Sequence, residues 1–307
     1  MNNSIKKKIV KKIGQSKNPI YSYGISLFAP FLYTRTLHKF AGGEKINWNG
    51  KKTCLTLSFD VDYREDVLAL PKLIELLSAY NFKTSFAVVG KWVEEYPKEH
   101  EMIVKNGHEI INHSYTHPNS RQLNPNKFFN KMSFEEQKEE IVKCDEVIKK
   151  ILGINAAGFR TPHFGNLHVN SVYDILANLN YLFSTSLTAA NSPTFGLPFE
   201  ERPSLWEFPV STCPKHPTST LDTWHALRKP GGFLKHGAWH KKEGELLKMF
   251  EYLTKIAIQY GSYVNLYFDP QDVVKLGGSW KMLEHLASVS EDVWVVNYSE
   301  LLNYLKK

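Results

Sequence analysis

Two carboxylates stand two positions apart in the stretch Ser58-Phe59-Asp60-Val61-Asp62. The residues before them, 53–59, are rich in β-branched and apolar side chains and predict a buried strand. Because Asp60 and Asp62 lie where the chain leaves the sheet, both should face the same mouth of the fold. Asp-x-Asp pairs also occur as helix caps, so this pair alone does not establish chemistry.

Two imidazoles, His113 and His117, follow the predicted strand 108–112. Four residues apart on a turn or short helix, they can converge on one cation. One carboxylate and two histidines leave coordination positions open for water and substrate, which is typical of a catalytic divalent-metal site. The same spacing also arises by chance in a chain with 12 histidines.

A third motif, Arg160-Thr161-Pro162-His163-Phe164, begins at the end of the predicted strand 157–160. A fixed guanidinium there can orient a carboxylate, although most arginines are surface groups or members of ordinary ion pairs. The three motifs fall at the ends of predicted strands, in a fixed order, and their coincidence favours a single active site.

Short β-branched segments alternate with helical patterns from residue 53 onward, which predicts a mostly parallel sheet with helices outside it, an α/β (β/α) barrel. The expected strands are 53–59, 84–89, 108–112, 157–160, 181–185, 205–209, 263–268 and 293–296. The expected helices are 65–80, 91–106, 133–152, 168–179, 243–260, 276–288 and 298–306. Helix 133–152 opens with a Ser133/Glu136 capping box. Residues 186–242 contain seven prolines and should be largely loop or hairpin.

The composition, with 42% hydrophobic and 22% charged residues, is that of a folded soluble protein. Three scattered cysteines exclude a disulfide framework and favour a reducing compartment. The formal charge of +7 suits an anionic partner. We expect no nucleic-acid partner, because the chain carries no binding motif of that class.

Residues 1–50 form a basic and aromatic extension ahead of a barrel domain at 51–307. Five lysines fall within the first twelve residues, and the stretch 21–40 is apolar but interrupted by Pro30. It is too short for a spanning helix, and a secretory signal is not evident. Two interpretations stay open: peripheral contact with an anionic membrane, and a helix packed on the barrel. We expect a cytoplasmic protein, with the inner membrane face as the alternative.

The chain resembles the polysaccharide deacetylases of the NodB-homology type, carbohydrate esterase family 4, over residues 52–300. Asp60-Val61-Asp62 is similar to the first motif in its Asp-Val-Asp variant, His113 to His117 to the second, and Arg160 to Phe164 to the third. Leu205 to Val210 is similar to the hydrophobic strand of the fourth. The resemblance implies an irregular (β/α)7-8 barrel and metal-dependent removal of an N-acetyl group from a sugar.

The resemblance also implies roles for these residues. Asp60 would be the general base, and Arg160 would hold it in place. Asp62, His113 and His117 would bind a divalent metal, most simply Zn²⁺, with Co²⁺, Ni²⁺ or Mn²⁺ as alternatives. The oxyanion would rest on the metal and on a backbone N–H near His163, and His163 and Phe164 would line the substrate site.

One departure concerns the family's late histidine, which protonates the leaving amine. This chain has Asp269 there, in Leu266-Tyr267-Phe268-Asp269-Pro270. Three explanations remain open: Asp269 is protonated and serves as the acid, a histidine takes over, or the protein is a weak or inactive relative that binds carbohydrate. The candidate histidines are His225, His236 and His240.

Aromatic residues gather in the Pro-rich region, in Trp224-His225 and in His236-Gly237-Ala238-Trp239-His240. Trp224 and Trp239 could form a sugar-stacking wall with His240 beside it, or could pack a loop onto the barrel. The expected substrate is an N-acetylated saccharide: a glycan, a lipid-linked sugar or a precursor. The sequence leaves the oligomeric state open.

Overall fold

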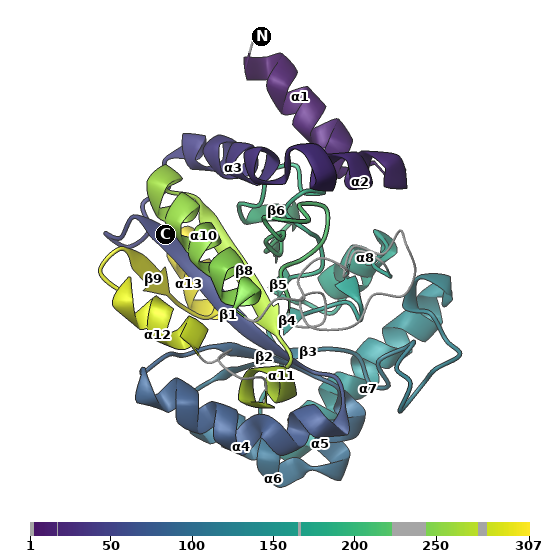
Figure 1. Cartoon of the computed structure of the whole chain (residues 1–307). Coiled ribbons are helices and arrows are strands. Elements are labelled where there is room, and N and C mark those ends of the chain that lie inside the picture. The colour runs from purple at the N-terminus through teal and green to yellow at the C-terminus, as the bar shows by residue number, and fades with distance from the viewer. Residues whose placement is uncertain (1–2, 17, 165–166, 223–243, 276–280) are drawn as a thin grey trace.

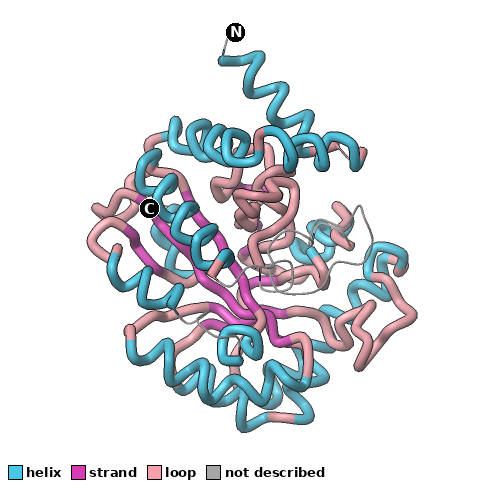
Figure 2. The backbone as a smooth tube through the Cα atoms, viewed as in Figure 1, coloured by secondary structure: helices cyan, strands magenta, loops and turns pink. Residues whose placement is uncertain are grey.

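A single curled sheet forms the centre of the structure, which is a computed structural model of the chain (Figure 1). The structure describes residues 3–16, 18–164, 167–222, 244–275 and 281–307. The strand order is β6-β7-β5-β4-β3-β2-β1-β8, with β9 paired to β1. All neighbouring strands are parallel except β6 and β7. Strands lie at the centre and helices surround them (Figure 2), which confirms the predicted α/β barrel-like fold.

All eight predicted strands are present: β1 Thr53–Val61, β2 Ser85–Val88, β3 Glu109–Asn112, β4 Gly158–Phe159, β5 Phe183–Ser184, β7 Leu205–Glu207, β8 Tyr263–Phe268 and β9 Val293–Val295. The ninth, β6 (Phe199–Arg202), forms an antiparallel hairpin with β7. That hairpin lies in the Pro-rich region, where a loop or hairpin was expected.

The helices of the barrel are α4 Arg64–Ala79, α5 Gly90–Glu95, α6 Pro97–Lys105, α7 Phe134–Leu152, α8 Ser171–Asn178, α10 Glu245–Tyr260, α11 Pro270–Lys275, α12 Lys281–Ser288 and α13 Tyr298–Leu305. The prediction of one helix over 91–106 was wrong, because Pro97 starts a second helix there. Helix α11 was not predicted. The capping box of α7 is confirmed, with Ser133 and Glu136 bonding each other's backbone N–H.

Strand β1 organises the sheet. Along one edge it pairs with β8, whereas its other edge is shared by β9 at its beginning and β2 at its end. All nine of its residues are buried, which explains its nearly continuous apolar sequence. It runs two residues further than predicted because β2 pairs with it as far as Val61. Asp60 is therefore held inside a strand.

The barrel is irregular on the side between β7 and β8. There the segment that follows β7 is joined to β8 by only a few hydrogen bonds. The Ser211 N–H donates to the Asn265 carbonyl at 2.8 Å. The Asn265 side-chain amide donates to the Phe208 carbonyl at 2.8 Å. Asn265 on β8 thus links the two sides of the curled sheet.

Three helices precede the sheet: α1 Asn3–Gly14, α2 Pro19–Phe28 and α3 Pro30–Ala41, followed by the short η1 Gly42–Glu44. Helix α3 packs on the barrel through Tyr33, Leu37 and Phe40, which share an apolar cluster with Cys54 and Tyr263 at the starts of β1 and β8. Of the two interpretations of the N-terminal extension, packing of a helix on the barrel is therefore observed for α3. No helix among the described residues is long and apolar enough to cross a bilayer.

We predict that Gly158→Ala destabilises the fold. A Cβ at this position would lie 2.0 Å from the Phe183 ring, and overpacking of a core costs about 1–3 kcal/mol. Chemical denaturation measures the loss in free energy of unfolding. Gly24→Ala in α2 is the matched control, because a Cβ there meets no atom within 4 Å; an equal loss in both variants would contradict the prediction.

We also predict a stability loss on mild acidification that depends on His38. Burial lowers the pKa of His38 to about 4, and its Nδ1 lies 2.7 Å from the Ser262 hydroxyl. The unfolded chain binds a proton near pH 6.5 whereas the folded chain does not, so stability falls as pH drops from about 6.5 toward 4.

The His38 contribution should be about 2 kcal/mol between about pH 7 and about pH 5. Urea unfolding of wild type and His38→Gln at both pH values measures it. The variant should lose less stability than the wild type over this interval, and equal losses would refute the assignment.

Candidate active site

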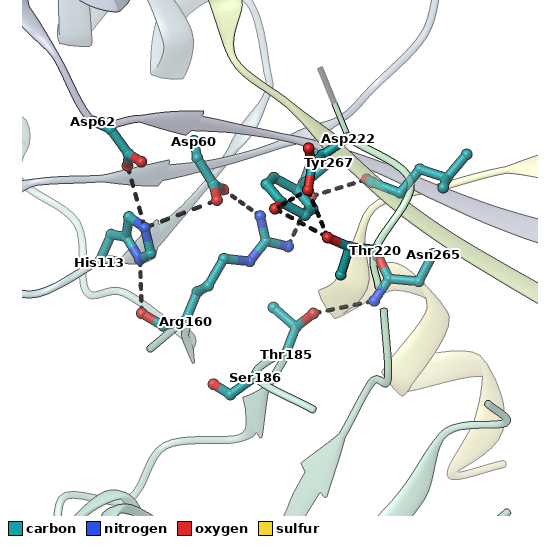
Figure 3. A network of polar contacts seen from close by, with 12 residues as sticks. Asp60, Asp62, His113, Arg160, Thr185, Ser186, Thr220, Asp222, Asn265 and Tyr267 are labelled. Carbon is teal, nitrogen blue, oxygen red and sulfur yellow. Dashed lines mark hydrogen bonds and ion pairs between the residues drawn. The ribbon is translucent and has the colours of Figure 1, made fainter. Parts of the chain in front are cut away.

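Asp60 and Asp62 project from the end of β1. Asp60 is buried, and the Asp62 side chain retains 16% of its exposure. Residues two apart on a strand point to the same face, so both carboxylates reach one site at the ends of the parallel strands. Figure 3 shows His113 in contact with both of them.

The two histidines sit on a turn that leaves β3. The His113 N–H donates to the Val88 carbonyl and extends the ladder between β2 and β3 by one residue. Ser114 and His117 then adopt left-handed backbone conformations, with φ of 66° and 50°. The Ser114 hydroxyl accepts from the His117 N–H at 3.1 Å. Such backbone conformations are costly for non-glycine residues and concentrate at functional sites.

Three ligand atoms converge at this point. Asp62 Oδ1 lies 3.2 Å from His113 Nε2 and 3.3 Å from His117 Nε2. The candidate ligand atoms of the three residues all lie within 4.8 Å of one another. None of these three atoms has a hydrogen-bond partner of its own among the described residues, although all are buried.

The tautomer of His113 makes this arrangement suitable for a cation. Its Nδ1 lies 2.7 Å from the Arg160 carbonyl, which can only accept, so Nδ1 carries the proton. Nε2 of the neutral ring then presents a lone pair to the Asp62 carboxylate. Either a proton on Nε2 or a cation between the two groups can balance this 3.2 Å contact. The donor set of one carboxylate and two imidazoles fits a divalent metal such as zinc.

Arg160, which follows β4, holds the other carboxylate. Its Nη1 donates to Asp60 Oδ1, and both side chains are buried. Its Nη2 donates to the Ser58 and Tyr298 hydroxyls, each at 2.8 Å. The Phe164 and Tyr267 rings lie against the guanidinium, at 5.0 and 5.3 Å.

The support of Arg160 contains residues that the sequence did not single out. The Tyr298 hydroxyl also donates to Asn265 Oδ1 at 2.6 Å, and Ser58 donates to the Leu266 carbonyl at 3.1 Å. Ser58, Asn265 and Tyr298 are buried polar residues in or beside apolar segments. Only the burial of their polar side chains distinguishes these three residues, and that burial is known only once the strands are placed.

The charges of the site shift the pKa of each group. Burial is the largest influence on Asp60 and raises its pKa, although Arg160 and His113 oppose it. Burial also disfavours ionised Asp62, but His117 and His113 outweigh it and hold the pKa well below its usual range. For His113, burial is outweighed by Asp60 and Asp62, so its pKa is raised. The pKa of each of these groups therefore depends on the charges of the others.

His163 and Phe164 lie beside the histidine turn. The His163 ring centroid is 4.7 Å from that of His117, and both residues 163 and 164 have a positive φ. Burial and the neighbouring His117 lower the pKa of His163 to about 4. Its neutral ring borders the site, as expected for a residue near the substrate.

Asp269 directly follows β8, at the same end of the sheet as Asp60 and Asp62. Burial raises its pKa well above the usual range, and Asp66, Asp62, Asp272 and Asp60 raise it further. Asp66, a buried residue that the sequence analysis missed, accepts from the backbone N–H groups of Tyr63 and Gln271. It therefore ties the start of α4 to α11, directly after Asp269.

The remaining predicted residues, Trp224, Trp239 and His240, lie outside the described residues, as do His225 and His236. Their proposed contacts with a sugar and the alternative acid role of the histidines stay predictions. The structure brings together the other eight: Asp60, Asp62, His113, His117, Arg160, His163, Phe164 and Asp269.

We predict that Arg160→Met destabilises the protein by about 3–5 kcal/mol, because it leaves the Asp60 carboxylate buried without its counter-charge. The double variant Asp60→Asn/Arg160→Met removes both charges and should recover much of that loss. Denaturant unfolding of wild type, both single variants and the double variant measures the coupling. Additive losses would contradict the ion pair.

Comparisons with known proteins agree with the site. The polysaccharide deacetylase family model matches residues 48–183, which include the carboxylate, histidine and arginine motifs. Peptidoglycan-N-acetylglucosamine deacetylase from Bacillus cereus is 29% identical over 121 residues, which are 39% of this chain and 40% of that protein. The matched part of this chain therefore spans less than half the length of that relative.

Solved structures share the fold. A polysaccharide deacetylase structure from Mycobacterium smegmatis has a TM-score of 0.70 at 18% identity and covers 85% of this chain and 93% of its own. A second, from Pseudomonas aeruginosa, has a TM-score of 0.62 at 13% identity and covers 83% and 92%. The chain is therefore similar to the polysaccharide deacetylase family over residues 48–183, which hold the candidate site, and it shares its fold with these solved structures.

Proposed function

We propose that the chain is a divalent-metal-dependent hydrolase that removes the N-acetyl group from an N-acetylated sugar. The observation that carries the proposal is the convergence of Asp62, His113 and His117 beside an Asp60 that Arg160 holds. The match to the polysaccharide deacetylase family over residues 48–183 supports deacetylation as the reaction. The metal, the sugar and the Asp-Val-Asp assignment are parts of the proposal.

Asp62, His113 and His117 would hold the cation, and their mixed oxygen and nitrogen set favours Zn²⁺, with Co²⁺, Ni²⁺ or Mn²⁺ as alternatives. When bound, a divalent cation supplies Lewis acidity, which acidifies water and polarises an amide carbonyl. The protein's part is to fix the ligands. The Arg160 carbonyl fixes the His113 ring, and the Ser114 hydroxyl fixes the His117 backbone.

Asp60 is placed to act as the general base. Arg160 binds its Oδ1, whereas its Oδ2 lies 3.8 Å from His113 Nε2 and faces the ligand cluster. A base is most effective when its pKa lies near the working pH. Burial moves the pKa of Asp60 in that direction, while the fixed guanidinium stabilises the ionised form.

Asp269 is placed to act as the general acid. The leaving amine must gain a proton before it departs, and burial with four neighbouring carboxylates favours the protonated form of Asp269. Its position after β8 puts it at the same end of the sheet as Asp60 and Asp62. The histidine alternatives stay open, because they lie outside the described residues.

The presence of aspartate in place of the family's histidine also favours a second candidate function. In this alternative the chain is a weak or inactive relative that binds carbohydrate and retains the cation. The two candidates differ in turnover and agree in binding, so kinetics distinguishes them.

The substrate we propose is a glycan, a lipid-linked sugar or a precursor saccharide. The name of the Bacillus cereus relative supports an N-acetylated amino sugar. A cytoplasmic location, at the inner membrane face or free of it, is part of the same proposal.

We predict that Asp60→Asn lowers the rate of acetate release from N-acetylated oligosaccharides by about 10²–10⁴-fold, the range for a general base. Released acetate is measured with the purified, metal-supplemented protein. Glu44→Gln is the control, because this exposed residue lies on η1, outside the site. Full activity of Asp60→Asn would overturn the proposed mechanism.

The role of Asp269 is tested by two substitutions. Asp269→Asn cannot donate a proton as a carboxylic acid does, so the rate should fall by about 10²–10⁴-fold with substrate binding retained. Asp269→His should not exceed the wild-type rate if the aspartate is the adapted acid. A large gain in rate for Asp269→His would instead support the weak or inactive relative.

A further inference from the structure

The positive charge of this chain is concentrated at its beginning. Residues 1–43 contain seven lysines and one arginine and no acidic residue. The chain as a whole has 38 basic and 31 acidic residues, so the remaining 264 residues hold 30 basic and 31 acidic ones. The charge excess of +7 is therefore a property of helices α1–α3 and their connections, and the barrel itself is close to neutral.

The same helices expose large apolar side chains. In α2, Ile20 and Phe28 are 75% and 86% exposed, and Tyr21 and Leu27 are also exposed. In α3, Leu32 is 67% exposed and Phe31 is exposed beside it. In α1, Ile5 and Ile9 are exposed one turn apart. Together these eight residues, which we call the apolar face, account for most of the exposed large hydrophobic residues in the described part of the chain.

On α1 and α3 the apolar face alternates with basic residues at helical spacing. On α1, Lys8 and Lys12 are exposed beside Ile5 and Ile9. On α3, Arg35 and Lys39 continue the exposed side that begins with Phe31 and Leu32. An apolar helix face flanked by lysine and arginine is the pattern of helices that lie in the interface of an anionic bilayer.

Specific contacts connect α1 and α3 to each other and to the rest of the protein. The Tyr33 hydroxyl donates to the Val10 carbonyl at 3.0 Å. The Lys7 and Lys11 ammonium groups lie 5.7 and 5.2 Å from the centre of the Phe195 ring. These contacts direct Lys7 and Lys11 toward the protein and leave Lys6, Lys8 and Lys12 exposed.

The apolar face lies away from the candidate active site. Helix α3 contacts the residues that precede or begin β8: Arg35 donates to the Tyr260 hydroxyl at 2.6 Å, and His38 meets Ser262. Asp269 lies at the other end of that strand. Figure 1 shows α1–α3 together on one side of the molecule. Docking of this face would therefore leave the site open to its substrate.

We infer that α1–α3 form a docking surface for an anionic lipid bilayer. The apolar face inserts at the level of the lipid head groups, and Lys6, Lys8, Lys12, Arg35 and Lys39 meet their phosphates. A hollow of about 810 Å³ beside α1, lined in part by Lys7, Lys8 and Lys11, offers room for a head group. The inference does not depend on the chemistry of the active site.

Sedimentation with lipid vesicles tests the inference on the full chain. The wild type should bind vesicles that contain phosphatidylglycerol and should bind phosphatidylcholine vesicles far more weakly, and high salt should weaken the binding. Lys6→Gln/Lys8→Gln/Lys12→Gln should lower the affinity for anionic vesicles by about a hundredfold, at roughly fivefold per lysine. Phe28→Ser/Leu32→Ser should lower it by at least about tenfold.

Matched controls distinguish binding through this surface from nonspecific electrostatic or hydrophobic adsorption to the vesicles. Lys149→Gln/Lys150→Gln/Lys306→Gln removes three exposed lysines from α7 and the end of α13. Leu68→Ser/Phe134→Ser removes two exposed apolar side chains from α4 and α7. Both controls should bind vesicles as the wild type does. Circular dichroism and denaturation check that every variant is folded.

Three results would overturn the inference. The first is failure of the wild type to bind phosphatidylglycerol vesicles. The second is an equal loss of binding in the test variants and their controls. The third is a wild-type dimer that Phe28→Ser/Leu32→Ser converts to a monomer without altering vesicle binding, since that result would assign the apolar face to a second copy of the chain.

Discussion

The buried ion pair between Arg160 and Asp60 is the constraint on which the rest of the site depends. Removing both charges from water is costly, and the cost is offset only if the remaining donors and acceptors are satisfied. Ser58 on β1 and Tyr298 on α13 accept hydrogen bonds from Nη2 of the guanidinium, and Asn265 on β8 positions Tyr298. The backbone carbonyl of Arg160 in turn fixes His113. One residue after β4 thus orients the candidate base through its side chain and a candidate metal ligand through its backbone.

The strand ends and the motifs on them were predictable because their signals are local. Buried parallel strands read as apolar segments, and Asp60, His113 and Arg160 each follow or end one. Ser58, Asn265 and Tyr298 were not predictable, because nothing in their own neighbourhoods distinguishes them from other buried polar residues. Their role comes from the pairing of β1 with β8 and the position of α13, which are long-range features. Pro97, by contrast, was a local signal that the predicted helix 91–106 overlooked.

Negative and positive side chains are concentrated in two different parts of the molecule. At the carboxyl ends of the strands, several carboxylates are brought together in a buried site, where a cation would relieve their repulsion. At the beginning of the chain, lysines and exposed apolar side chains cover α1–α3. Helix α3 contributes Tyr33, Leu37 and Phe40 to a core cluster, so these helices cannot be deleted without cost to the barrel. The exposed surface of α1–α3 can therefore be altered without disturbing the barrel only by point substitutions at exposed positions.

In the proposed mechanism Asp62, His113 and His117 hold a divalent metal that Asp60 does not bind. Elemental analysis of the purified protein after dialysis against a weak chelator tests it most directly. We expect about one equivalent of metal per chain in the wild type and in Asp60→Asn, and almost none in His113→Ala/His117→Ala. The absence of metal from the wild type, even after zinc or cobalt is added back, would contradict it. So would full metal content in the double histidine variant.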